Sequence, residues 1–331
     1  MRSNVRVVII SLACICTGGA SVAADALPVW AYGVPTAAAG NSPATPTGRV
    51  GQTPQTAPDN ASLKRLPGSS GAFTLPQIRD GFGPADWYPA DHPQMPDIVA
   101  HGRRPDVRAC ALCHYPNGKG RAENAPIAGY PTAYFIQQMA DFKNGARKSA
   151  EPRKANTNVM IAIAKAMTDD EVKTSAEYFG SMKWTPWIKV VETNTVPKTR
   201  IVGGLFLALQ DGEKEPLGQR IIEVPENAEA TEVLRDPRSG FIAYAPVGSI
   251  KKGEALAKTM QCGVCHGADL KGLGPIPGIV GRSPSYFVRQ LYDMQRGARK
   301  GIWTELMTPV VTKLSEEDIL VLAAYTSSLM P

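Results

Sequence analysis

The sequence has few histidines and cysteines, and beyond its first two dozen residues it has no long apolar run. Four histidines and six cysteines occur among 331 residues. A bilayer span needs roughly 20 apolar residues, so we expect no transmembrane segment in the mature chain, although that chain could still associate with a membrane-bound complex. The formal net charge is only +6, which argues against a nucleic-acid partner.

Residues 1–24 have the pattern of a secretory signal peptide. Arg2 and Arg6 precede a short apolar core over 7–15, and small residues offer a cleavage site after Ala24. A membrane anchor is the alternative, but the apolar core is shorter than a bilayer span. We therefore predict a periplasmic protein, and two of the six cysteines leave with the signal peptide.

The next stretch, residues 25–75, is rich in proline, threonine, alanine, glycine and serine and shows no apolar periodicity. Such a composition buries too little apolar surface to offset the entropy of folding. We predict a disordered, flexible N-terminal tether, with order beginning near Phe73.

The remainder of the chain contains an internal repeat. When Cys110 is placed on Cys262, the copies align without a gap as far as Lys148 and Lys300, where both hold a Gly-Ala-Arg-Lys turn. Apolar residues recur at helical spacing in both copies, and helix-capping patterns recur with them. The predicted fold is therefore mainly α, with two small domains in tandem over 76–185 and 249–331.

Between the copies lies a connector, residues 186–248, that no helical pattern covers. Short apolar runs over 189–193, 205–209 and 220–224 are typical of strands, and prolines separate them. Unstructured loops of this length are uncommon, so we expect a partly β, irregular segment that packs on the domains.

Each copy opens with the pattern Cys-x-x-Cys-His. Two thiols one helical turn apart can bond covalently to the two vinyl groups of a haem, and the following histidine then lies beneath the ring and ligates the iron. A zinc ribbon or a thioredoxin-like pair needs no histidine after both motifs. The motifs predict two covalently attached haems c, held by Cys110, Cys113 and His114 and by Cys262, Cys265 and His266.

A methionine on the opposite face would complete each iron site. Most methionines fill cores, but the repeat distinguishes one pair, because only Met160 and Met307 align with each other as methionine. Each follows a stretch that we expect to be extended. We predict the axial pairs His114/Met160 and His266/Met307, and a ligand on both faces leaves no open position for a substrate.

Other polar residues are secondary candidates. His92 and His101 have no counterpart in the second copy, so we expect structural or surface roles for them. A backbone carbonyl at Pro126, and one at Pro275 or the competing Pro277, would orient the ligating histidines.

Two cationic pairs recur in the repeat, Arg147-Lys148 and Arg299-Lys300. They could pair with haem propionates or steer an acidic partner. Alternatively, they complement the dipole at a solvated helix end.

Residues 95–185 and 250–331 resemble class I cytochrome c domains of the cytochrome c4 type. The resemblance rests on the Cys-x-x-Cys-His motif, the later Tyr-Phe-x-x-Gln pattern, the Gly-Ala-Arg-Lys turn, the aligned methionine and the acidic opening of the last helix. The chain departs from that type in its long tether, its long connector and a helix before the first motif that Gly102 and Pro105 interrupt.

The resemblance implies a periplasmic dihaem electron-transfer protein rather than an enzyme. It would shuttle single electrons between a dehydrogenase or quinol-linked donor and an oxidase or other acceptor. The alternatives are a dihaem enzyme of the peroxidase or thiosulfate dehydrogenase type, or a cytochrome subunit of a quinoprotein dehydrogenase complex.

Overall fold

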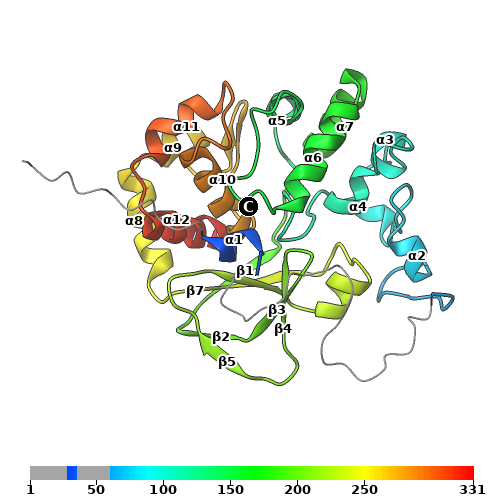
Figure 1. The fold of residues 1–331 in the computed structure, drawn as a ribbon, viewed down its shortest axis with the longest axis horizontal. Coiled ribbons are helices and arrows are strands. Elements are labelled where there is room, and N and C mark those ends of the chain that lie inside the picture. Colours follow the sequence, from blue (N-terminus) through cyan, green and yellow to red (C-terminus); the bar gives the residue numbers. More distant parts are fainter. Residues whose placement is uncertain (1–27, 36–59) are drawn as a thin grey trace, which may run out of the picture.

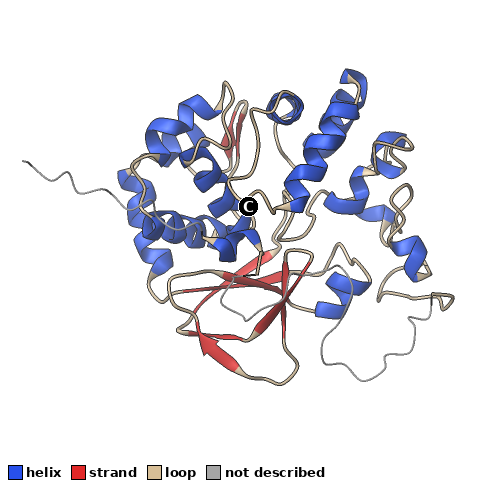
Figure 2. Ribbon diagram, in the orientation of Figure 1, coloured by secondary structure: helices blue, strands red, loops and turns tan. Residues whose placement is uncertain are grey.

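The computed structural model describes residues 28–35 and 60–331. Two helical units lie side by side, and short strands gather along one side of them (Figures 1 and 2). The chain is thus mainly α, with two tandem domains and a partly β connector. Among the described residues, no helix is long and apolar enough to cross a lipid bilayer.

The first helical unit, α3–α7, follows the helix signals of the sequence. α7 begins at a capping box, in which Thr168 Oγ1 accepts from the Glu171 amide and the Glu171 carboxylate accepts from the Thr168 amide. α5 contacts both α6 and α7, and Phe142, Met167 and Phe179 lie in the core between them. The helices are α3 (Asp97–Ala100), α4 (Cys110–His114), α5 (Thr132–Lys143), α6 (Ala155–Ala166) and α7 (Asp169–Gly180).

The second helical unit, α8–α12, is built around the crossing of α8 and α12. Gly253 allows this close approach, because a Cβ at that position would lie 2.0 Å from the Val321 carbonyl oxygen. Val321 and Leu322 then bury their side chains in the core. The elements are α8 (Ser249–Thr259), α9 (Cys262–His266), β8 (Gly272–Leu273), β9 (Ile276–Pro277), α10 (Pro284–Gln295), α11 (Thr304–Val311) and α12 (Glu316–Ser328).

The units differ in the helix that precedes each motif. α8 is continuous, whereas α3 ends at Ala100 and the chain turns at Gly102, whose φ is +64°. A side chain at Gly102 would also meet the Val107 carbonyl oxygen at 2.2 Å. The predicted interruption of this helix is therefore confirmed.

The connector forms a small three-stranded sheet and two further antiparallel strand pairs, β2-β5 and β3-β4. The sheet has the order β1-β7-β6, in which β1 and β7 are parallel and β6 is antiparallel to β7. β1 contacts α12 and β6 contacts α10, so the connector packs on the second unit as expected. Its elements are β1 (Ile188–Glu192), β2 (Thr195–Pro197), β3 (Thr199–Val202), β4 (Leu205–Ala208), β5 (Lys214–Pro216), β6 (Ile222–Pro225), the π-helix η2 (Glu229–Val233) and β7 (Phe241–Ala245).

Parts of the predicted tether differ from the expectation of disorder. The N-terminal strap, residues 28–35, contains α1 (Val29–Tyr32), and its Ala31 and Tyr32 are buried in the core of the second unit. Residues 60–75 pair Lys64 with Phe73 and bury Leu66. α2 (Leu75–Ile78) and the 3₁₀ helix η1 (Pro89–Asp91) follow. These segments are ordered because a few of their apolar side chains pack against residues that are distant in the sequence.

The remaining predictions for the N-terminal region concern other residues. The signal peptide over 1–24, and the rest of the tether, lie outside the residues that the structure describes.

Candidate haem-binding sites

The two Cys-x-x-Cys-His motifs form the short helices α4 and α9, and each lies at a cavity of about 360 Å³. Both thiols and the histidine line the cavity in each unit. One helical turn separates the two thiols, as the attachment chemistry requires. The remaining walls are largely aromatic and aliphatic, including Phe135, Phe142 and Phe179 in the first cavity and Phe287, Leu291 and Leu322 in the second.

Each motif histidine is oriented by a backbone carbonyl eleven residues further along the chain. His114 Nδ1 lies 2.9 Å from the Ala125 carbonyl oxygen, and His266 Nδ1 lies 2.8 Å from that of Pro277. The prediction of Pro126 and Pro275 is therefore wrong, whereas the competing Pro277 is right. A donating Nδ1–H leaves Nε2 as the unprotonated ligand atom.

Burial keeps these imidazoles neutral. It lowers the pKa of His114 and of His266, although the carbonyl hydrogen bond opposes the shift in each case. A neutral imidazole is the form that ligates iron. The site therefore presents the nitrogen donor in the required protonation state.

Met160 and Met307 line the two cavities at equivalent positions of the repeat. The prediction that extended segments carry them is wrong, because Met160 lies on α6 and Met307 on α11. Apolar side chains of both helices pack into the core, which favours a helix over an extended segment. Other methionines also line the cavities, namely Met139 and Met167 in the first and Met260 and Met294 in the second.

The two cavities meet at a wall that both units build. Tyr134, Gln138, Tyr286 and Gln290 line both of them. Each pair occupies equivalent positions of the repeat, so the wall has approximate two-fold symmetry. This shared wall brings the two candidate haem sites next to each other.

Arg147 and Arg299 are buried at this wall, rather than exposed at helix ends. Arg147 donates to Tyr286 Oη at 3.0 Å and to Gln290 Oε1 at 2.8 Å. Arg299 donates to Tyr134 Oη and Gln138 Oε1, both at 2.8 Å. The solvated-end interpretation is therefore wrong for the arginines.

The surroundings of the two arginines also test whether a haem would fit these cavities. Within residues 28–35 and 60–331, neither guanidinium makes an ion pair with a carboxylate, and Arg299 Nε has no hydrogen-bond partner. Buried charges are normally paired. A haem contributes two propionates, so the donors, the apolar walls and the buried cations all fit that group.

A second polar cluster, which sequence reasoning missed, lies beside the first cavity. Lys154 Nζ donates to the Tyr32 carbonyl at 3.1 Å, and burial lowers the pKa of Lys154 to about 7. Arg289 donates to the Ala31 carbonyl at 2.7 Å. Lys154 and Arg289 lie close in the sequence to the recurring pairs Arg147-Lys148 and Arg299-Lys300. Nothing in the sequence points to Tyr32.

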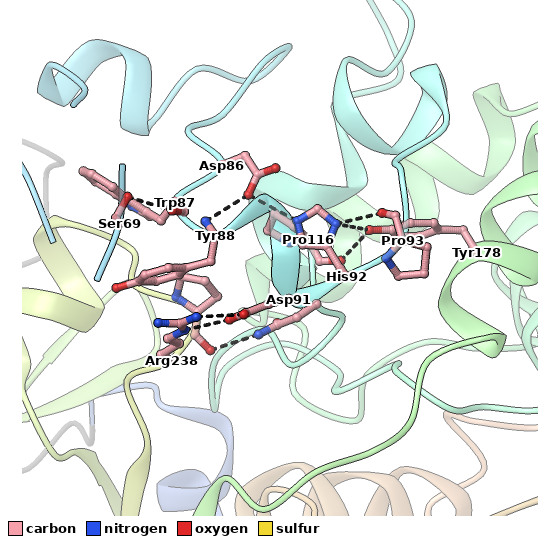
Figure 3. A network of polar contacts seen from close by, with 12 residues as sticks. Ser69, Asp86, Trp87, Tyr88, Asp91, His92, Pro93, Pro116, Tyr178 and Arg238 are labelled. Carbon is pink, nitrogen blue, oxygen red and sulfur yellow. Dashed lines mark hydrogen bonds and ion pairs between the residues drawn. The ribbon is translucent and has the colours of Figure 1, made fainter. Parts of the chain in front are cut away.

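The other two histidines do not line either cavity. His92 Nε2 lies 3.2 Å from Asp86 Oδ1 and His92 Nδ1 lies 3.1 Å from Tyr178 Oη, within a polar network (Figure 3). His101 is exposed at the end of α3. The surface and structural roles expected for them agree with these positions.

Comparison with known proteins decides the family. No protein-family model matches the chain. Cytochrome c4 of Pseudomonas aeruginosa is 37% identical over 225 residues, which cover 66% of this chain and 83% of that protein. The chain belongs to the cytochrome c4 family. It is accordingly a dihaem electron-transfer cytochrome with two covalently attached haems c.

This member of the cytochrome c4 family is similar to two further proteins. A protein named thiosulfate dehydrogenase electron acceptor, from Stutzerimonas stutzeri, is 24% identical over 227 residues, covering 68% of this chain and 80% of its own. The structure of reduced cytochrome c4 from Pseudomonas stutzeri aligns with a TM-score of 0.43 and 22% identity, over 66% of this chain and 93% of that one.

Proposed function

We propose that this cytochrome is a periplasmic single-electron carrier whose haems are held by the residues of the two motifs. The thiols of Cys110 and Cys113 would attach one haem, and those of Cys262 and Cys265 the other. The observation that carries the proposal is the identical arrangement in both units, where two thiols and a carbonyl-oriented histidine share one apolar cavity.

The axial ligands follow from the same arrangement. His114 and His266 would ligate through Nε2, and Met160 and Met307 would complete the coordination. When bound, haem c supplies one-electron redox chemistry, and thioether ligation raises its reduction potential. The protein's part is to exclude water, to fix the imidazole through its Nδ1–H bond and to surround the site with apolar walls.

The proposed donor is a dehydrogenase or a quinol-linked enzyme, and the proposed acceptor is an oxidase or another oxidant. The relative named as an electron acceptor of thiosulfate dehydrogenase supports a dehydrogenase as donor. The signal-peptide pattern over 1–24 supports the periplasm as the location. A cytochrome subunit of a larger dehydrogenase would use the same two iron sites.

A redox titration followed by optical spectra tests the ligation. We expect two low-spin haems per chain, and the methionine–iron charge-transfer band of the oxidised protein should lose about half its intensity in Met160→Ala and likewise in Met307→Ala. Met182→Ala, on a methionine that lines neither cavity, is the matched control. An unchanged spectrum in either ligand variant would contradict the assignment.

The same preparation tests the enzyme alternatives. An iron with a ligand on both faces offers no position for peroxide or thiosulfate, so we expect no turnover of either compound. Measurable turnover by the purified protein would show that one site is open or opens readily.

A further inference from the structure

The two motif helices differ in how far their surroundings shield them from solvent. The repeat pairs Leu112 of the first motif with Val264 of the second. Leu112 is half-buried, whereas Val264 is 71% exposed. Cys113 is half-buried as well, while its counterpart Cys265 is exposed. The second thiol of each motif, which marks the haem periphery, is therefore covered in one unit and open in the other.

The connector provides the cover over the first motif. Arg235 donates a hydrogen bond to the Leu112 carbonyl oxygen, and Asn117 Nδ2 donates to the Pro237 carbonyl at 3.0 Å. Arg235 holds a φ of +55°, a left-handed conformation that is strained for a non-glycine residue. Such a conformation persists where surrounding contacts fix it, and here those contacts are with the motif. We call residues 234–238 the cap.

Residues 60–92 hold the cap from its other side. Trp87 Nε1 donates to the Leu234 carbonyl at 2.8 Å. Arg238 forms an ion pair with Asp91 at 2.6 Å and lies 3.7 Å above the ring of Tyr88. Figure 3 shows Arg238 between Asp91 and Tyr88, in the same network that reaches the chain just after the first motif. The cap is thus held between the first motif on one side and residues 60–92 on the other.

The second motif instead lies beside an apolar surface. Val264 and Leu306 line the rim of the second cavity and are 71% and 67% exposed, and Leu273 of the neighbouring hairpin is 58% exposed. We call these three side chains the apolar face. Large apolar side chains gathered in solvent indicate an interaction surface.

The charges around the apolar face indicate the kind of partner. Lys258 is paired with Glu254 at 2.6 Å. Within 261–273 and 300–313 the exposed cations still outnumber the exposed acids, with Lys271, Lys300 and Lys313 against Asp269 and Glu305. Opposite charges at the rim of an interface speed association and orient the partner. A redox protein with an apolar contact area edged by carboxylates fits this surface.

We propose that the second haem is the port through which this cytochrome exchanges electrons with such a partner, and that the cap makes the first haem an internal store. Electrons of the first haem then leave through the second, across the wall that the two cavities share. This inference rests on the proposed attachment of a haem at each motif, and it adds the direction in which electrons move between the two haems. A haem count of two per chain tests that attachment separately.

Solvent access to each haem is measured directly by proton NMR of the oxidised holoprotein with a soluble gadolinium chelate. Haem methyl signals that shift in Val264→Glu belong to the second haem. We expect the chelate to broaden these signals first, and to broaden the other set only in Arg235→Ala or in Asn117→Ala, which loosen the cap. Equal broadening of both sets in the wild-type protein would overturn the proposal, even with two haems bound.

Oxidation kinetics provide the second measurement. Ferricyanide, an anion that stands in for an acidic partner, takes one electron from each reduced haem and becomes ferrocyanide. A carboxylate in Val264→Glu should slow its approach about threefold, and this slowing should apply to both halves of the absorbance change. Val247→Glu adds the same charge at a site that is 62% exposed and lines neither cavity, and it should leave both halves unchanged. If one half keeps its wild-type rate in Val264→Glu, the first haem has its own exit.

Discussion

The N-terminal strap joins the two helical units through a single buried residue. The Tyr32 side chain is fully buried, and its hydroxyl donates to Asp293 Oδ1 at 2.7 Å. The carbonyl of the same residue accepts from Lys154 at 3.1 Å. Asp293 belongs to α10 of the second unit, and Lys154 directly precedes α6 of the first. Loss of the Tyr32 contacts should therefore weaken the whole assembly.

Tyr32→Phe removes the hydroxyl alone, and the ring and the backbone carbonyl stay in place. A hydrogen bond to a charged group contributes about 1.5–3 kcal/mol to stability. Asp293 Oδ1 also accepts from the Ala150 amide at 2.8 Å, so the carboxylate keeps one partner in the variant. We therefore expect the free energy of unfolding to fall by about 2 kcal/mol.

Guanidinium unfolding of the holoprotein, followed by circular dichroism, measures this loss. Tyr244→Phe is the matched control, because the Tyr244 hydroxyl makes no hydrogen bond within the part of the chain that the structure describes. The control should stay within about 0.5 kcal/mol of wild type, because the ring keeps its packing and the hydroxyl has no partner to lose. If Tyr32→Phe is no less stable than Tyr244→Phe, the hydrogen bond from Tyr32 to Asp293 does not stabilise the assembly.

Two further predictions concern packing and pH. Gly253→Ala should lower the unfolding free energy by at least about 2 kcal/mol, since its Cβ would lie 2.0 Å from the Val321 carbonyl oxygen. Gly263→Ala is the control and should be tolerated, because its Cβ would lie 3.6 Å from the nearest atom, Ala268 Cα. Equal unfolding midpoints for the two variants would contradict this packing. The hydrogen bond from the Arg238 guanidinium holds the pKa of Asp91 in the folded protein below its usual value. The Asp91 carboxylate therefore stabilises the fold at pH values above its unfolded pKa of about 3.9. This stabilisation is lost as the pH falls through the lower pKa of the folded state. Both side chains are partly exposed, so Asp91→Asn should cost about 0.5 kcal/mol at pH 7, and a loss of the same size in urea unfolding near pH 2 would refute the linkage.

The candidate haem sites could be predicted from the sequence because their chemistry is local. The thiols and histidine lie within one short helix, and the carbonyl that orients the histidine follows eleven residues later in both copies. The repeat supplied a second test at each position. It distinguished Met160 and Met307 from the other methionines, and both line the cavities, although helices rather than extended segments carry them.

Long-range contacts could not be predicted in the same way. Arg147 and Arg299 each follow a glycine turn, which suggested solvated helix ends, yet each is buried by tyrosine and glutamine side chains of the opposite unit. Tyr32 lies in a proline-rich stretch that suggested disorder, and its partners are more than a hundred residues away. Periodicity and composition describe a segment but not its neighbours in space.

The sequence by itself determined that two haems attach and that the chain contains two similar helical domains, and it predicted which residues would hold each haem. These properties depend on spacings of a few residues, which covalent geometry and helical periodicity impose on any chain. The tertiary structure decided that the cavities share a wall, that the strap pins both units and that the cap covers only one motif. Those features depend on which surfaces bury each other, and Arg235 reaches Leu112 only because the folded connector passes over it.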